Sequence, residues 1–380
     1  MERIVYLDNA ATAPLLPAAL SAMREALERE YGNPSSRYPL GTRTAGLIRT
    51  ARADVAALLG CAPDEIFFTS GGTEGDNHAL LGAAEALGRR GRHIVTTAVE
   101  HAAVLETAKY LESKGFQVTY LKPDRRGEIA LSALEEALRP DTILVSMMLV
   151  NNELGTVFPV AEAAELLRKS GSGALLHTDA VQAVGKTAFT IASLGADLVT
   201  VSAHKLGGPK GAGALFVRRG VRIPPLLHGG GQENGMRSGT EATHQILGLA
   251  AACRVWNTEG GVFRARLADL NAYARETLSN ALPELVFLAD GGAGHILPLS
   301  LPGYKSEVLV RFLGDRGVCV SAGSACHRGR ASHVYAALGL SRPVRDGAFR
   351  VSFSPANTKA DIDALRDGLL SAKSTLLQSM

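Results

Sequence analysis

The chain has 380 residues, of which 46% are hydrophobic and 20% charged, and its formal net charge is +3. This length predicts one large core with a smaller second domain, and so small and dispersed a charge argues against direct nucleic-acid binding. No apolar run is long enough to span a membrane and the first residues do not resemble a signal peptide, so we expect a cytoplasmic protein. Four cysteines without a C-x-x-C pair predict neither a disulfide framework nor a standard zinc site.

Apolar runs typical of strands alternate with helical patterns from about residue 64 to about residue 218, which predicts an α/β fold with a mostly parallel sheet. Segments 131–138 and 159–169 are amphipathic and are predicted to be helices packed on that sheet. Polar residues follow each of five apolar runs. The runs are 65–69, 93–97, 142–149, 174–178 and 196–201, and the polar groups after them include Thr73, His101, Asn152, Asp179 and Lys205. If the strands are parallel, these groups meet at one edge of the sheet.

The pattern changes after Trp256, where a long helical stretch over 262–282 precedes strand-like segments at 296–300 and 349–353. We interpret this as a smaller α+β domain at the C-terminal end. The predicted division is a large domain over 15–261 and a small domain formed by 1–14 together with 262–380.

Lys205 follows a buried strand and precedes a glycine-rich turn, where a lysine among apolar neighbours can form a Schiff base with a carbonyl cofactor. A solvated loop lysine is the alternative. Asp179 ends the preceding strand, and a buried carboxylate there requires a cation such as a protonated pyridine nitrogen, unless it caps the next helix.

The segment from Ser70 to Asn77 joins a strand to a helix, and its glycines allow backbone N–H groups to face a phosphate. A plain helix cap by Ser70 or Thr73 is the alternative. His101 could stack on an aromatic ring or could be a hydrogen-bonded structural histidine.

Residues 321–330 form a run of small residues that contains Cys326 beside a histidine and two arginines, surroundings that favour a thiolate nucleophile. A metal site of Cys319, Cys326, His327 and His333 is the rival interpretation, but the spacing matches no common zinc pattern, so we expect no metal. Arg350 lies in an alternating strand and could clamp a substrate carboxylate, although a surface arginine is the default.

A second phosphate-binding pattern appears over 179–187, which follows a strand and ends in Gly-Lys-Thr. Ala180 occupies the position where a P-loop requires its first glycine, so a nucleotide hydrolase is disfavoured.

Taken together, these motifs resemble the cysteine desulfurases of the NifS and IscS type, which have the class V aminotransferase fold. The resemblance spans nearly the whole chain. It is carried by residues 6–12, 32–36, 69–77, 100–101, 150–155, 177–182, 202–205, 236–240 and 323–326. It implies a pyridoxal 5'-phosphate (PLP) enzyme of fold type I that works as a homodimer.

The resemblance also implies roles for single residues. Lys205 holds the cofactor as a Schiff base, Asp179 pairs with the pyridine nitrogen and His101 stacks on the ring. Arg350 takes the substrate carboxylate, and Cys326 is the nucleophile. The other implied cofactor contacts are Gln182 and Asn152 near the phenolic oxygen, and Gly72, Thr73, Ser202, His204 and the partner subunit's Thr240 at the phosphate.

The implied reaction converts L-cysteine to L-alanine and leaves a persulfide on Cys326, which supplies sulfur to an acceptor or scaffold protein for iron–sulfur cluster assembly or tRNA thiolation. A selenocysteine lyase or another enzyme of the class V fold is the nearest alternative, and an inactive binding scaffold is a more distant one. Two positions depart from the family pattern. Tyr38 stands where the family usually has histidine, and the segment from Cys326 to Ser332 is short.

Overall fold

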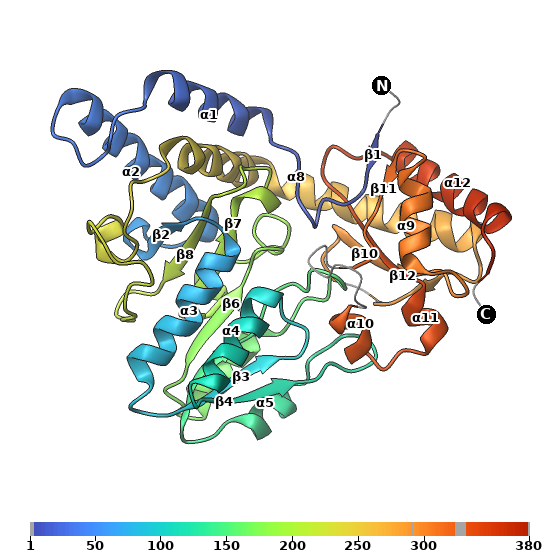
Figure 1. Cartoon of the computed structure of the whole chain (residues 1–380), viewed down its shortest axis with the longest axis horizontal. Helices are drawn as coiled ribbons and strands as arrows, with labels where there is room; N and C mark the ends of the chain where they lie inside the picture. The colour runs from blue at the N-terminus through green and yellow to red at the C-terminus, as the bar shows by residue number, and fades with distance from the viewer. Residues whose placement is uncertain (1–3, 291, 324–331, 379–380) are drawn as a thin grey trace.

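The computed structural model describes residues 4–290, 292–323 and 332–378, and its central element is a seven-stranded sheet (Figure 1). In spatial order the strands are β2 (Ile66–Thr69), β8 (Gly213–Val217), β7 (Leu198–Ser202), β6 (Leu175–Asp179), β5 (Thr142–Ser146), β3 (His93–Thr97) and β4 (Gln117–Leu121). The predicted mostly parallel sheet is confirmed.

β8 is antiparallel to both of its neighbours, β2 and β7, whereas every other pair in this sheet is parallel. Two reversals restore the original direction, so β2 runs the same way as β7. The carboxyl ends of β2, β3, β5, β6 and β7 therefore lie at one edge of the sheet. This is the arrangement that brings the polar groups after these strands together.

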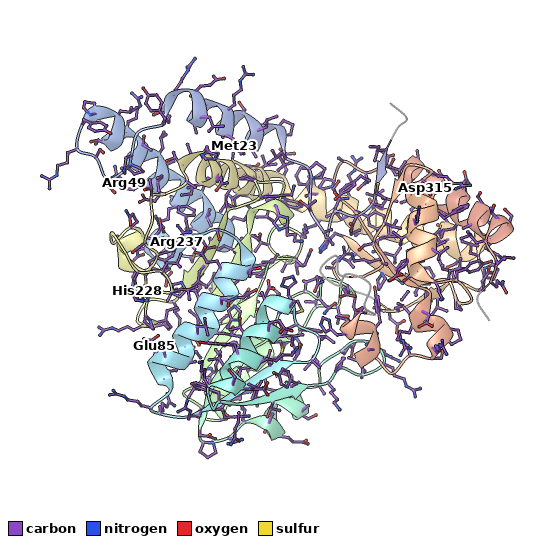
Figure 2. The ribbon with its side chains drawn as sticks, in the orientation of Figure 1. Met23, Arg49, Glu85, His228, Arg237 and Asp315 are labelled. Atoms are coloured by element: carbon purple, nitrogen blue, oxygen red, sulfur yellow. The ribbon has the colours of Figure 1, made fainter. Side chains whose placement is uncertain are left out.

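Helices connect and cover the strands: α3 (Gly72–Leu87), α4 (Ala102–Ser113), α5 (Leu131–Ala137), α6 (Val160–Lys169) and the short α7 (Ile191–Leu194). α3 buries the small side chains Ala79, Ala83 and Ala84 and exposes Glu85 on its other face (Figure 2). Such small residues allow a helix to approach the sheet closely, and α3 begins at the edge where the site residues lie.

Two N-terminal helices, α1 (Pro17–Arg29) and α2 (Pro39–Leu59), pack on the long helix α8 (Thr243–Ala281). Proline occupies the first position of α1 and of α2, where no intrahelical N–H bond is lost. Gly60 ends α2 in the left-handed region, with φ 69°.

The C-terminal part contains a three-stranded antiparallel sheet of β9 (Val286–Phe287), β10 (Ile296–Ser300) and β12 (Ala348–Ser352), with β10 in the middle. β1 (Val5–Tyr6) pairs in parallel with β11 (Val318–Cys319), so the start of the chain lies beside this part. Its helices are α9 (Ser306–Gly314), α10 (His333–Ala337), α11 (Arg342–Asp346) and α12 (Lys359–Thr375).

The predicted start of the long helix at residue 262 is wrong, because α8 already begins at Thr243. Gly260 is buried within the helix, where packing outweighs the low helix propensity of glycine. The predicted boundary between 261 and 262 falls inside α8, and the domain division stays a prediction. Among the helices described, none is both long and apolar enough to cross a membrane.

Candidate active site

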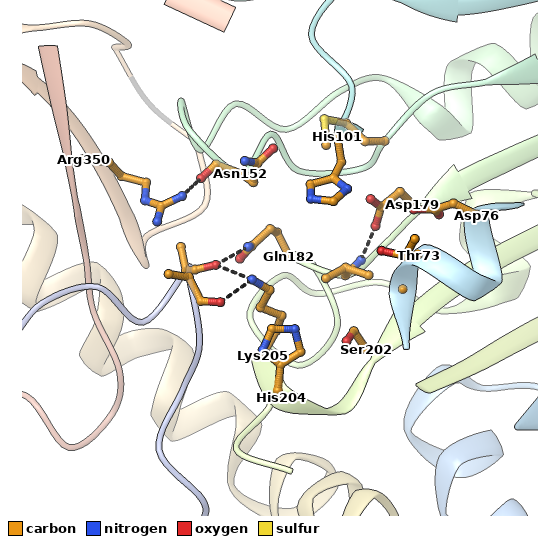
Figure 3. A pocket seen from close by; sticks show the side chains of 15 residues that line it. Thr73, Asp76, His101, Asn152, Asp179, Gln182, Ser202, His204, Lys205 and Arg350 are labelled. Carbon is orange, nitrogen blue, oxygen red and sulfur yellow. Dashed lines mark hydrogen bonds between the residues drawn. The ribbon is translucent and has the colours of Figure 1, made fainter. Parts of the chain in front are cut away.

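A cavity of about 280 Å³ lies at the carboxyl edge of the large sheet, next to the C-terminal part (Figure 3). Side chains from the ends of β6 and β7, the segment after β5, the starts of α3 and α4, and β12 converge on it. Ten of the twelve predicted site residues line it: Gly72, Thr73, His101, Asn152, Asp179, Gln182, Ser202, His204, Lys205 and Arg350. Asp76 and Met148 line it too.

Lys205 ends a 3₁₀ turn (Ala203–Lys205) that directly follows β7, and its side chain reaches toward the first residues of the chain. Its Nζ donates hydrogen bonds to the carbonyl oxygens of Ala10, at 2.7 Å, and Ala11, at 2.6 Å. The alternative of a solvated loop lysine is therefore wrong, because the ammonium is directed into the cavity and held there.

Asp179 is the last residue of β6 and is 5% exposed. Its Oδ1 accepts a hydrogen bond of 2.8 Å from the N–H of Val181, within a turn and not at the start of a helix. Burial raises the pKa of Asp179, while the Val181 N–H and the charge of Lys205 lower it. A carboxylate in this position favours a cationic neighbour.

His101 is the N-cap of α4, where its Nδ1 accepts a hydrogen bond of 3.2 Å from the N–H of Ala103. The same ring lines the cavity, so its structural and ring-stacking roles are compatible. The adjacent Glu100 is fully buried, and burial raises its pKa to about 8 even though the N–H of Met148 and the hydroxyl of Thr97 both donate to Oε1.

The first turn of α3 forms the opposite wall. Gly71, with φ 149°, caps the helix without a side-chain hydrogen bond, so the predicted alternative of a Ser70 or Thr73 cap is wrong. A Cβ atom on Gly72 would lie 2.9 Å from Cγ2 of Val181, so glycine keeps this wall open. Ser202 and His204 face the same space, and burial and Lys205 lower the pKa of His204 to about 4.

Arg350, on β12, is 2% exposed and so is not the surface arginine of the default interpretation. Its Nη2 lies 2.7 Å from Oδ1 of Asp8, and its Nη1 donates to the carbonyl oxygen of Asn152 at 2.6 Å. Its Nε has no hydrogen-bond partner among the residues that the structure describes. Donors of a guanidinium that lines the cavity, Nε among them, thus stay unused by the described residues.

Gln182 lies in the turn after β6 and is buried. Its Nε2 donates to the carbonyl oxygen of Ala10 at 2.8 Å, and its Oε1 is 3.4 Å from Nε2 of His295. Ala10 therefore accepts hydrogen bonds from both Lys205 and Gln182, which fixes the two side chains relative to each other.

Thr240 does not line this cavity. It is exposed beside a second pocket that includes Ser70, Arg237 and Gln245. Two ion pairs attach the loop that carries it to helices α2 and α3. Arg52 of α2 binds Glu233 through two contacts of 2.7 Å, and Nε of Arg237, labelled in Figure 2, lies 2.9 Å from Oε1 of Glu74 on α3.

Cys326 and His327 lie outside the described residues. The described residue Ser321 exchanges two backbone hydrogen bonds with Arg350, and Ser332 donates to Oε2 of the buried Glu153 at 2.5 Å. The residue before the cysteine segment, Ser321, is thus bound to Arg350, and the residue after it, Ser332, is bound to Glu153, the neighbour of Asn152. In the described part of the chain, no cluster of three or more His, Cys, Asp or Glu side chains could hold a metal.

Sequence reasoning missed Asp8 and Asp76. Asp8 is the carboxylate that holds Arg350, and Asp76 is a buried cavity wall residue next to Asp179 (Figure 3). A sequence signal existed for Asp76, because it lies one helical turn after Gly72 and therefore faces the same side of α3.

Comparison with known proteins assigns the family. The sequence family Aminotransferase class-V matches residues 5–365. Cysteine desulfurase IscS of Dictyoglomus turgidum is 41% identical over 375 residues, which cover 97% of this chain and 94% of the relative. The chain belongs to the cysteine desulfurases of the class V aminotransferase family. The predicted family is therefore confirmed.

Solved structures of this family have the same fold. A NifS-like protein aligns with a TM-score of 0.93 at 38% identity and covers 98% of this chain and 100% of its own. The protein SspA, solved in complex with cysteine, aligns with a TM-score of 0.79 at 33% identity and covers 93% of this chain and 99% of its own. The fold is that of the PLP-dependent enzymes of fold type I, as predicted.

Proposed function

We propose that this cysteine desulfurase removes the sulfur of L-cysteine, releases L-alanine and leaves a persulfide on Cys326. The observation that carries the proposal is the cavity itself, in which Lys205, Asp179, His101 and Arg350 converge from four separate segments. The relatives named above support the reaction, and SspA supports cysteine as the amino acid bound.

The cavity fits pyridoxal 5'-phosphate. A phosphate suits the open wall at Gly72 and Thr73, where the N-terminus of α3, Ser202 and His204 supply donors. The buried carboxyl of Asp179 suits a cationic ring nitrogen, and the face of His101 suits the ring. Gln182 and Asn152 would bind near the phenolic oxygen, and Lys205 would form the covalent link. When bound, the cofactor supplies an electron sink that weakens the bonds at the substrate's α-carbon.

Arg350 would bind the carboxylate of the substrate through the donors left free by Asp8 and Asn152. Lys205, once released from the cofactor, would carry a proton between the substrate carbons, since its ammonium already lies in the cavity. The thiolate of Cys326 would attack the substrate sulfur. An S–S bond forms as the C–S bond breaks, and a proton takes the place of sulfur on the carbon.

We further propose a homodimer. Thr240 is exposed and does not line the cavity of its own chain, which supports a role at the cofactor phosphate of a second copy. The persulfide would pass to an acceptor or scaffold protein for iron–sulfur cluster assembly or tRNA thiolation. A thiol that must stay reduced between turnovers favours the cytoplasm as the location.

The decisive test is an anaerobic reaction of the purified, PLP-loaded protein with L-cysteine and a reducing thiol, with alanine and sulfide measured separately. We expect equal amounts of both products. Turnover of L-selenocysteine without turnover of L-cysteine would instead indicate a selenocysteine lyase, and keto acid formation without sulfide would indicate an aminotransferase.

A further inference from the structure

Two acidic side chains lie side by side in the wall of the cavity, and the proposed reaction uses only one of them. Asp179 is 5% exposed and Asp76 is 1% exposed (Figure 3). Asp76 comes from the second turn of α3 and Asp179 from the end of β6, two elements that pack on each other.

The two carboxyls differ in their partners. Asp179 accepts a hydrogen bond from the N–H of Val181, and the charge of Lys205 lowers its pKa. Asp76 interacts with the hydroxyl of Thr200, and its Oδ1 has no hydrogen-bond partner in the described ranges. Nε2 of His177 lies 3.6 Å from Oδ1 of Asp76.

His177 cannot supply a positive charge. It is fully buried on β6, with Nδ1 2.9 Å from Oγ of Ser146 and Nε2 3.1 Å from Oγ1 of Thr200. Burial lowers the pKa of His177 to about 3, so its ring is neutral at neutral pH. A third acid, the buried Glu100 before α4, also raises the pKa of Asp76.

Two adjacent carboxylates in a buried site cannot both ionise without a compensating cation, so the pair retains one proton. The proton resides on the carboxyl whose ionised form is stabilised less. Burial, Asp179 and Glu100 all raise the pKa of Asp76, and only the hydrogen bond with the Thr200 hydroxyl lowers it. The pKa of Asp179 is also raised by burial, but the N–H of Val181 and the charge of Lys205 both lower it.

We propose that Asp76 is a positioning residue that holds the single proton of this acid pair and so keeps Asp179 as the ionised partner of a cationic ring nitrogen. The inference rests on the proposed binding of PLP and deepens it. No bond other than a hydrogen bond is formed, and the proton does not leave the pair.

The test compares Asp76→Asn, which imitates a neutral carboxylic acid, with Asp76→Leu, which removes every polar atom at similar size. Glu85→Gln removes an exposed acid from the same helix and is the matched control. We expect the PLP dissociation constants of Asp76→Asn and Glu85→Gln to stay within about twofold of the wild-type value. The Leu variant should weaken PLP binding about tenfold, the scale of one hydrogen bond to a charged group.

The absorbance of the bound cofactor gives a second readout. In the Leu variant the pH at which the ring nitrogen loses its proton should move down by about one unit, because Asp179 holds that proton less strongly. An Asn variant as impaired as the Leu variant would overturn the proposal, since an ionised Asp76 would then be required. Wild-type behaviour of both variants would also overturn it.

The apoprotein tests the proton assignment without any cofactor. An acid whose folded pKa is raised loses stability as pH rises from its unfolded to its folded pKa. Wild-type apoprotein should therefore lose unfolding free energy relative to Asp76→Asn as the pH rises above the ordinary carboxyl pKa, with Glu85→Gln matching the wild type. Equal pH dependence of wild type and Asn variant would overturn the inference. Failure of the wild type to bind PLP would overturn only the proposed function.

Discussion

Lys205 donates a hydrogen bond of 2.7 Å to the carbonyl oxygen of Ala10, a residue 195 positions earlier in the chain. The contact joins the end of β7 to the segment that leads from β1 into α1. It fixes the ammonium in the cavity before any substrate arrives, and such preorganisation is what a group that forms a covalent link needs.

Lys205→Ala should abolish turnover of L-cysteine, with a loss of more than about 100-fold, because the base and the covalent link disappear together. Borohydride reduction followed by peptide mass spectrometry should attach the cofactor to residue 205 in the wild type and nowhere in the variant. Lys122→Ala, at an exposed position, is the control. A labelled peptide in the Lys205→Ala protein would show that another lysine holds the cofactor.

Cys326→Ser should keep the cofactor spectrum and lose sulfide and alanine production by more than about 100-fold, since only the nucleophile is removed. Cys61→Ser, at a partly buried position outside the cavity, provides the comparison and should remain active. Trapping with iodoacetamide after a single turnover should detect a persulfide on Cys326. Sustained sulfide release by the serine variant would contradict the nucleophile assignment.

Arg350→Lys should raise the KM for L-cysteine by about 10- to 100-fold, because lysine cannot form two parallel hydrogen bonds to a carboxylate. It should also lower the unfolding free energy by about 3 kcal/mol, since Asp8 loses part of a buried pair. Arg342→Lys, an exposed arginine on α11, should change neither value. An unaltered KM would show that a group other than Arg350 binds the substrate carboxylate.

Glu233→Ala should destabilise the protein by about 3 kcal/mol, because it leaves the Arg52 guanidinium and the Phe68 N–H without their shared acceptor. The same change should weaken PLP binding in the dimer, since the loop with Thr240 loses its attachment. Denaturant unfolding and PLP titration measure the two effects. Glu28→Ala removes the exposed pair with Arg24 and should cost under about 1 kcal/mol.

Lys186 is buried beside the site, and its Nζ has no hydrogen-bond partner in the part of the chain that the structure describes. Burial, together with Lys205 and Arg350, lowers the pKa of Lys186 to about 7 from the ordinary 10.5. The folded state thus binds fewer protons than the unfolded state between these values. The contribution of Lys186 to the free energy of unfolding therefore falls as the pH drops from 10.5 to 7, and it is lowest below pH 7.

Lys186→Met should therefore stabilise the protein at pH 7 by roughly 2 to 4 kcal/mol, and this gain should shrink toward pH 10. Chemical unfolding at both pH values measures the difference. Lys210→Met, at an exposed position, should show no such pH dependence. A Met variant that is less stable than wild type at pH 7 would mean that the buried ammonium has a stabilising partner.

The sheet and most of the cavity could be predicted from the sequence for one physical reason. β-branched apolar runs mark buried strands, and parallel strands bring their carboxyl ends together, so Asp179 and Lys205 were placed by the same rule. The antiparallel direction of β8 was not predicted, because periodicity carries no information on strand direction.

Contacts between distant segments could not be predicted in this way. The pairing of Arg350 with Asp8 joins residues 342 positions apart, and neither position has a local pattern that indicates the other. The start of α8 was missed because Gly260 and Gly261 have low helix propensity, which tertiary packing overrides. Asp76 was overlooked because an acid near the start of a helix is usually explained by the helix dipole.

Helix α8 has 39 residues and is therefore about 58 Å long, and it extends from the pocket beside Thr240 to the C-terminal sheet. Its buried side chains include Leu249 and Trp256 on one half and Leu270 and Leu278 on the other. A fragment that ended in the middle of this helix would expose apolar surface at the cut on both pieces. The chain is therefore poorly suited to expression as two separate halves, and a split or tagged version should be interrupted at an exposed loop instead.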